Sequence, residues 1–145
     1  MHISKAGLDL IKKYEGCRLE AYKPVPDEPG WTIGYGHHSP SVKQGMTITQ
    51  EIAEQLLKED LAKFERVVSN IGVRLRQNEF DALVCIAFNI GEGAFITSTL
   101  RKKVIEKARK DAEIQAEFKK WNKSGGKVLQ GLVNRRADEA ELWLR

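Results

Sequence analysis

Two positions near the N-terminus carry residue types that can perform acid–base chemistry. Glu15 stands between Tyr14 and Gly16, at the expected end of a first helix. A carboxyl group that apolar neighbours shield from water resists ionisation, and in its protonated form it can act as a general acid. Thr32 follows in the segment 31–37 (WTIGYGH), and a threonine hydroxyl can hold a water molecule by hydrogen bonding. A solvated glutamate and an ordinary hairpin strand are the structural alternatives for these positions.

The alternation of bulky and small residues in this segment predicts a strand with one packed face. Trp31, Ile33 and Tyr35 fall on one side of the strand, while Thr32 and Gly34 share the other. A glycine on an open face lets a ligand come close to the backbone. We therefore expect Gly34 to contact a substrate beside Thr32.

The elements expected to position these residues are strands near the N-terminus and helices along the rest of the chain. Prolines at positions 24, 26 and 29 exclude a helix there, so residues 19–23 and 31–35 are predicted to form a β-hairpin. Apolar residues at helical spacing predict a long helix over residues 49–71, with Thr49 as its N-cap. Two further helices are predicted over residues 4–14 and 78–90, and Asn78 is the expected cap of the second. Three more helices are predicted to begin at Thr97 or Ser98, at Asp111 and at Leu132. A flexible break is expected at residues 124–126, and the buried face of the last helix is expected to carry Val133, Ala137, Ala140 and Leu144.

Strands that are segregated from helices along the sequence predict an α+β fold in which helices dominate. We expect one domain over residues 1–145, because a chain of this length buries roughly two-thirds of its unfolded surface. Its parts would be a small β-hairpin lobe over about residues 12–48 and a larger all-helical lobe of residues 1–11 and 72–145, joined by the helix over residues 49–71. A cleft between two such lobes suits an extended ligand.

Composition excludes several classes of function. No apolar run approaches the ~20 residues that span a bilayer, so no stable membrane insertion is expected. The first residues lack the pattern of a secretory signal, which predicts synthesis in the cytoplasm. In that reducing compartment Cys17 and Cys85 are expected to be free thiols. The histidines and cysteines have no metal-ligand spacing, so no metal site is expected.

The positive charge is concentrated in the C-terminal third of the chain. Residues 1–100 carry 11 Lys/Arg and 13 Asp/Glu, a net charge of −2, whereas residues 101–145 carry 13 and 7, a net charge of +6. Such a surface can face nucleic acid, a membrane surface or an acidic wall polymer, or it can be a solvated helical surface. Acidic residues interrupt the basic ones, and a nucleic-acid footprint is usually denser. We therefore expect no nucleic-acid partner; DNA binding, if present, would weaken steeply with salt.

Several segments, taken together, resemble the phage lysozymes, the endolysins of glycoside hydrolase family 24. The resemblance covers nearly the whole chain and implies the two-lobed lysozyme fold, a monomer and no cofactor. The substrate it implies is the glycan strand of peptidoglycan, cut at the β-1,4 bond between N-acetylmuramic acid and N-acetylglucosamine. The matching segments are YEGCRLEAY at 14–22, WTIGYGH at 31–37, GMTIT at 45–49, FDAL at 80–83, FNIG at 88–91, STL at 98–100, Trp121 and GLVNRR at 131–136.

The resemblance implies roles for five residues. Glu15 matches the family's glutamate, the general acid that protonates the leaving glycosidic oxygen, and Thr32 matches the threonine that helps to place the attacking water. Phe88 and Asn89 match positions that line the floor of the cleft, where core packing and helix capping are the alternatives. His37 matches the family's histidine and is expected to be a structural partner for a carboxylate.

One member of the family's catalytic set does not match. The family's aspartate usually stands nine positions after the glutamate and six before the threonine, and here Pro24 and Pro26 occupy those positions. Asp27 is the nearest carboxylate, and a longer turn stiffened by prolines would bring it to the usual place. Glu28 is the second candidate. Aspartate is also favoured in exposed turns for conformational reasons alone.

Three functions follow from these alternatives. A muramidase would hydrolyse the wall with Glu15 as its acid. An enzyme with Glu15 but without a second catalytic carboxylate would act as a lytic transglycosylase, in which a hydroxyl group of the sugar itself attacks the anomeric carbon in place of water. A module that lost the chemistry would still bind the wall. Because the first residues lack a secretory signal, we expect synthesis in the cytoplasm of a bacterial host. The family resemblance implies that the protein then reaches the wall through a phage-encoded pore, a holin.

Overall fold

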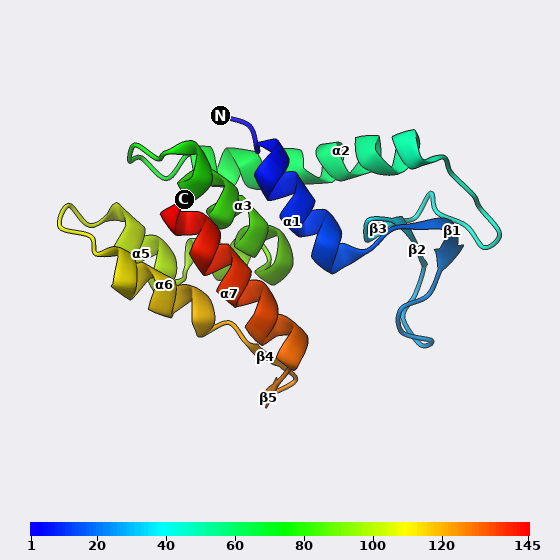
Figure 1. Ribbon diagram of the computed structural model, residues 1–145. Helices are drawn as coiled ribbons and strands as arrows, with labels where there is room; N and C mark the ends of the chain where they lie inside the picture. Colours follow the sequence, from blue (N-terminus) through cyan, green and yellow to red (C-terminus); the bar gives the residue numbers. More distant parts are fainter. The chain divides into compact units, whose positions relative to one another are not determined.

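The computed structural model describes all 145 residues, and the chain divides into two compact units. One unit is Ile11–Lys63, and the other combines Met1–Leu10 with Phe64–Arg145. No helix has both the length and the apolar character that crossing a membrane requires. The elements, in chain order, are α1 (Lys5–Glu15), β1 (Arg18–Tyr22), β2 (Trp31–Gly34), β3 (His37–Ser39), α2 (Gln50–Ser69), α3 (Gln77–Ile90), α4 (Glu92–Ile96), α5 (Thr99–Ile105), α6 (Asp111–Lys119), β4 (Lys123–Ser124), β5 (Lys127–Val128) and α7 (Gln130–Leu144) (Figure 1).

The unit Ile11–Lys63 contains an antiparallel sheet in the order β1-β2-β3. The two-stranded hairpin expected from the sequence is therefore incomplete, because a third strand follows it. Gly34 and Gly36 adopt φ values of +66° and +78°, a region that glycine enters without steric penalty, and the chain reverses there. In the resulting register, Thr32 lies directly opposite Tyr22 on one side and His38 on the other.

The sheet has one face in the core of this unit. Ala21, Ile33 and Val42 are buried there, with Trp31, Ile48 and Leu56 packed against them. Residues directly opposite each other in an antiparallel pair share a face, so Tyr22, Thr32 and His38 form a row across the three strands. Thr32 and the adjacent core residue Ile33 therefore lie on opposite faces of β2, as the sequence pattern predicts.

The long helix is confirmed as α2. The amide of Ile52 donates to Thr49 Oγ1 at 3.2 Å, which satisfies one of the free backbone donors at the start of the helix. Its buried stripe repeats at helical spacing and consists of Ala53, Leu57, Leu61, Phe64 and Val68.

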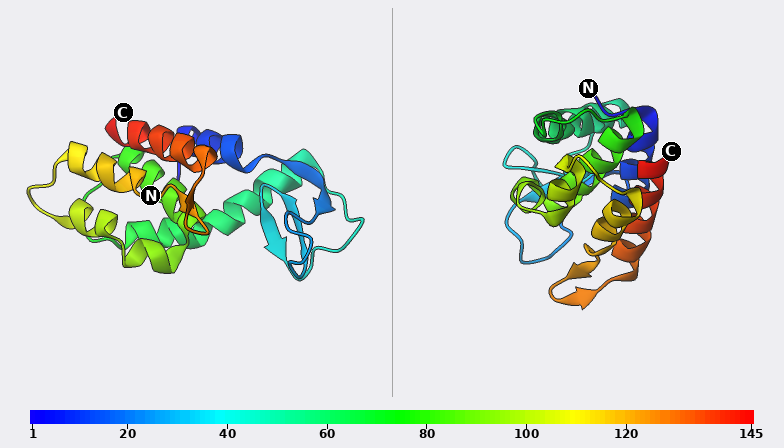
Figure 2. Two further views of the ribbon diagram at one scale, coloured as in Figure 1. Left: turned by 90° about the horizontal axis from the view of Figure 1, so that it is seen from below. Right: turned by 90° about the vertical axis from the view of Figure 1, so that its left-hand side faces the viewer.

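Helix α3 forms the centre of the second unit and packs against α7, which also lies beside α6 (Figures 1 and 2). Every residue of α3 from Glu79 to Ala87 is buried. Asn78 does not cap this helix as predicted, because the N-cap is Arg76. Instead, Asn78 Nδ2 donates to the carbonyl of Trp143 at 2.7 Å, where the last turn of α7 leaves carbonyl groups without a partner in the helix.

Two expectations for the C-terminal part are wrong. This part is not all helical, because residues 123–128 form the β4–β5 hairpin, which projects beside the first turn of α7 (Figure 2). Gly125 and Gly126 adopt φ values of +57° and +79°, which a two-residue hairpin turn requires, so a hairpin turn stands where a break was expected. The α+β class is confirmed.

Helix α7 buries charged residues where apolar ones were expected. Arg135, Arg136 and Glu139 are at most 3% exposed, whereas Ala137 and Leu144 face solvent. Arg136 Nε lies 2.7 Å from Glu139 Oε1, and Arg135 Nε lies 3.2 Å from Glu139 Oε2. Each charge is thus paired, which is how a folded chain tolerates ions in its core.

This cluster predicts a pH dependence of stability. Burial raises the pKa of Glu139 from 4.5 to about 7, against the opposing effect of the two guanidiniums. Between these values the folded protein holds a proton that the unfolded chain releases, so the free energy of unfolding falls as the pH rises through this window. Urea unfolding at about pH 5 and about pH 7.5 measures the change. Glu139→Gln, which cannot titrate, should show a smaller decrease; an equal decrease would contradict the assignment.

Candidate active site

Glu15 is the last residue of α1 and is half-buried. Its carboxylate lies against the turn between β2 and β3: a Cβ atom added to Gly36 would stand only 3.0 Å from Glu15 Oε1. Gly36 also has a φ of +78°, so both the backbone conformation and the close approach require glycine there. The glycine-rich segment therefore forms the surface on which the candidate acid rests.

Thr32 lies on the strand that leads into this turn. Its side chain is only 5% exposed, and its Oγ1 lies 3.1 Å from His38 Nδ1. Glu15 and Thr32 are thus parts of the same unit: Glu15 contacts Gly36, four residues after Thr32 along the β2–β3 hairpin. The two residues selected from the sequence by their chemical type belong to one local structure.

His37 has the structural partner that was expected. Its Nδ1 lies 2.8 Å from Asp60 Oδ2, on α2. This contact ties the start of β3 to the long helix within the unit Ile11–Lys63. It holds the turn that contacts Glu15.

Gly34 is buried, and its backbone packs against α2. A Cβ atom at this position would stand 3.4 Å from Ala53 Cβ and 3.5 Å from Ile48 Cδ1. The small size of Gly34 therefore lets the strand approach the helix closely, a role in packing that the alternation pattern does not reveal.

Asp27 lies in the exposed turn between β1 and β2. The amide of Glu28 donates to the carbonyl of Val25 at 3.1 Å and closes this turn, and Lys23 Nζ donates to the carbonyl of Glu28 at 3.3 Å. The carboxylates of Asp27 and Glu28 make no hydrogen bond or ion pair. Both side chains are therefore available to another group, and neither is held by a protein partner.

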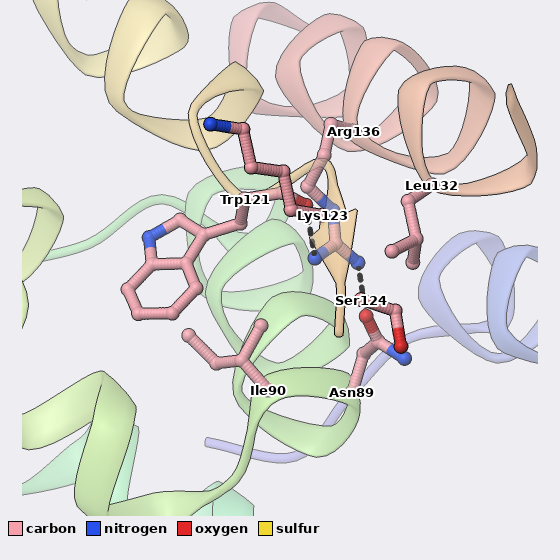
Figure 3. A pocket seen from close by; sticks show the side chains of 7 residues that line it. All are labelled: Asn89, Ile90, Trp121, Lys123, Ser124, Leu132 and Arg136. Atoms are coloured by element: carbon pink, nitrogen blue, oxygen red, sulfur yellow. Dashed lines mark hydrogen bonds between the residues drawn. The ribbon is translucent and has the colours of Figure 1, made fainter. Parts of the chain in front are cut away.

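Phe88 and Asn89 end helix α3 in the other unit. The ring of Phe88 packs edge-on against Phe64, with the centroids 5.5 Å apart. Asn89 Oδ1 accepts a hydrogen bond of 2.9 Å from Arg136 Nη2, so its Nδ2 group remains a donor (Figure 3). Asn89 borders a pocket of about 290 Å³ that is also lined by Ile90, Trp121, Lys123, Ser124, Leu132 and Arg136 (Figure 3).

The pocket combines an aromatic wall with polar groups held in fixed directions. Arg136 Nη1 also donates to the carbonyl of Trp121, at 3.4 Å (Figure 3). Because the guanidinium is buried, it fixes both Trp121 and Asn89 at the edge of the pocket. Lys123 adds a positive charge from the β4–β5 hairpin. This arrangement suits a polar ligand with an acyl or carboxylate group.

The chain contains no group of three or more His, Cys, Asp or Glu side chains arranged to hold a metal ion. Cys17 is exposed and Cys85 is buried, and both are free. Burial raises the pKa of the Cys85 thiol well above its usual value, which makes this cysteine unreactive.

The sequence profile of the family described as phage lysozyme matches residues 12–139. The chain belongs to the phage lysozyme family. The match includes the C-terminal end of α1 with Glu15, the sheet that carries Thr32, and most of the helical C-terminal part. The resemblance seen in the sequence motifs is confirmed.

Two endolysins and one muramidase domain are similar to this chain over almost its entire length. The endolysin of Bacillus phage PZA is 49% identical over 99% of this chain, and the endolysin of Acyrthosiphon pisum secondary endosymbiont phage 1 is 46% identical over 99%. The chain spans 55% of the length of the first relative and 98% of the second. The muramidase domain of SpmX from Asticaccaulis excentricus superposes with a TM-score of 0.88 at 40% identity, over 100% of this chain and 99% of that one. The lysozyme-like fold is therefore confirmed.

Proposed function

We propose that this protein is a muramidase that hydrolyses the β-1,4 bond between N-acetylmuramic acid and N-acetylglucosamine in bacterial peptidoglycan. The observation that carries the proposal is the contact of Glu15 with the β2–β3 hairpin of Thr32, in a chain of the phage lysozyme family. An acid and a residue that holds water are the two functions that glycoside hydrolysis needs close together. The names of similar proteins, endolysin and muramidase domain, support the same activity.

In the proposed reaction, Glu15 donates its proton to the bridging oxygen as the bond to the leaving sugar breaks. Proton donation stabilises the leaving group and is worth roughly 10²–10⁴ in rate. A water molecule attacks the anomeric carbon, with Thr32 holding its oxygen in place. A base takes one proton from this water as it attacks, and the other proton stays on the new hydroxyl group at the anomeric carbon. The same anionic group stabilises the oxocarbenium-like transition state. We assign this role to Asp27.

The role of Asp27 predicts a large loss on substitution. Asp27→Ala should lower the rate of reducing-end release from purified peptidoglycan by roughly 10²–10⁴-fold, because the attacking water loses its base. Folding should be unaffected, since this exposed side chain has no protein partner. Glu28→Ala, one residue further along the same turn, is the matched control and should keep full turnover. Wild-type turnover of Asp27→Ala would exclude Asp27 as a catalytic residue, and loss in Glu28→Ala alone would transfer the role to Glu28.

We assign substrate contacts to Gly34, Phe88 and Asn89. The free Nδ2 donor of Asn89 supports this role, since acetamido and peptide carbonyls on the wall polymer are hydrogen-bond acceptors. For Phe88 the support is the family resemblance, beside the contact of its ring with Phe64. For Gly34 the support is its place on β2 two residues after Thr32, beside the packing of its backbone against α2.

A lytic transglycosylase is the second candidate. It is favoured by one observation: no protein group holds the carboxylate of Asp27 in a defined direction. If no base acts on water, the hydroxyl of the muramic acid itself can attack, and the product is an anhydro-sugar. Mass spectrometry of the digested glycan distinguishes the two reactions, because hydrolysis leaves reducing ends.

A further inference from the structure

His38 makes a contact with the candidate site that the sequence did not indicate. It lies on β3 directly opposite Thr32, and its Nδ1 is 3.1 Å from Thr32 Oγ1. Thr32 is 5% exposed and His38 is exposed, so the contact joins a buried hydroxyl to an imidazole at the surface. The hydroxyl of a threonine carries one donor and two acceptor sites, and the partner that takes the donor fixes the direction of the others.

The other edge of the His38 ring lies against the turn that carries Asp27. A Cβ atom on Gly30 would stand 3.1 Å from His38 Nε2 and 3.2 Å from Cε1. Gly30, with a φ of +86°, is the last residue of this turn before β2 begins. The imidazole therefore lies between the Thr32 hydroxyl and the last residue of the turn that contains Asp27.

We propose that His38 is a positioning residue that fixes the hydrogen-bonding direction of the Thr32 hydroxyl, and through it the attacking water. This inference rests on the proposed function. His38 does not touch the substrate in this account. It acts on Thr32 from the neighbouring strand, and its ring packs against Gly30 at the end of the turn that holds Asp27.

The direction of the hydrogen bond depends on which nitrogen of the imidazole carries hydrogen. With hydrogen on Nε2, Nδ1 accepts the proton of the Thr32 hydroxyl, and Thr32 Oγ1 is left to accept a hydrogen bond from the attacking water. Both lone pairs of the water then stay free, and one of them attacks the anomeric carbon. With hydrogen on Nδ1, the ring donates to Oγ1, and the Thr32 hydroxyl donates to the water and occupies one of these lone pairs. The proposed role therefore places the hydrogen on Nε2.

Few other groups interact with His38. From β1, Tyr22 lies beyond Thr32 in the same row, with Arg18 stacked on its ring. The turn that contacts His38 holds Lys23, Asp27 and Glu28. None of these side chains makes a hydrogen bond or ion pair with His38, and the neighbouring His37 is engaged by Asp60. The Thr32 hydroxyl is therefore the only hydrogen-bond partner of the His38 ring in the chain.

Two substitutions separate this role from a structural one. In His38→Asn, the amide oxygen can take the place of Nδ1 as an acceptor. In His38→Leu, the volume is retained and the acceptor is lost. We expect His38→Leu to lower kcat/KM by roughly ten-fold, the value of about one hydrogen bond, and His38→Asn to stay within about three-fold of the wild type. His2→Leu, at a side chain that is 92% exposed, is the control and should have no effect.

The comparison of the two variants gives the decisive readout, because a purely structural role would make both of them lose activity. Equal losses in both variants, or wild-type activity in His38→Leu, would overturn the role of His38. Nitrogen-15 NMR should show the hydrogen of the His38 ring on Nε2; hydrogen on Nδ1 would also overturn the role. Absence of any reducing ends from the wild type would instead refute the proposed function.

Discussion

Glu15→Gln should lose essentially all hydrolysis of purified peptidoglycan, a decrease of roughly 10²–10⁴-fold or more in kcat. Glutamine has nearly the same shape as glutamic acid, but its amide does not release a proton to the leaving oxygen. Because the side chain is only half-buried and keeps its volume, the melting temperature should change little. Reducing-end release and thermal unfolding, measured on the same preparation, check both parts.

A matched control is available on the neighbouring strand. Glu20 is exposed on β1, and Glu20→Gln removes one negative charge without touching the proposed site. It should retain wild-type activity. Full activity in Glu15→Gln would remove the acid role of Glu15, and equal losses in both variants would point to a general effect of charge on binding to the wall.

Arg136→Ala should destabilise the fold by about 3–5 kcal/mol, the largest effect on stability that we expect. The Arg136 guanidinium is fully buried, pairs with Glu139 at 2.7 Å and donates to Asn89 at 2.9 Å. Its removal leaves a buried carboxylate with one cation fewer and the carbonyl of Trp121 without this donor. Urea unfolding with linear extrapolation measures the change.

Arg145 provides the comparison for Arg136. It pairs with Glu141 at 3.4 Å, and the two side chains are 57% and 67% exposed. Ion pairs in such surroundings contribute little, so Arg145→Ala should change stability by less than about 0.5 kcal/mol. If both variants were equally stable, the buried cluster would not hold α7 in the way described.

Helices were predictable from the sequence where an apolar stripe alone determines burial. Helix α2 is the clearest case, since its buried residues recur at helical spacing and Thr49 caps its start. Helix α7 shows the limit of this reasoning. Its buried face includes Arg135, Arg136 and Glu139, which become compatible with burial only through contacts with one another. A periodicity of apolar residues cannot reveal such a face.

Strand β3 and the β4–β5 hairpin were not predicted because they are too short to show a periodic pattern. Strand β3 has three residues, two of them histidine, and thus has no alternation to detect. The signal that identifies it is the turn: positive φ at Gly34 and Gly36 reverses the chain, and pairing of Ile33 with His37 then places His38 opposite Thr32. The β4–β5 hairpin is similar, because Gly125-Gly126 is a hairpin turn that was interpreted as a break.

The residues of the candidate site show the same difference between what sequence patterns indicate and what strand register determines. Glu15 and Thr32 were selected by residue type and motif, and the structure adds that Gly36 lies against the carboxylate. His38 was missed because its importance comes from strand register, which depends on β3. Gly34 was expected at an open face, and its contact with Ala53 reflects a positive φ that breaks the simple alternation of the strand.

Hydrolysis of wall glycan by the carboxyl group of Glu15 is tested by mass spectrometry of the soluble muropeptides released from purified peptidoglycan, with Glu15→Gln digested in parallel. Hydrolysis with Glu15 as the acid predicts products that end in reducing N-acetylmuramic acid from the wild type and none from the variant. Anhydro-muramic acid ends, or the same reducing products from both proteins, would contradict it.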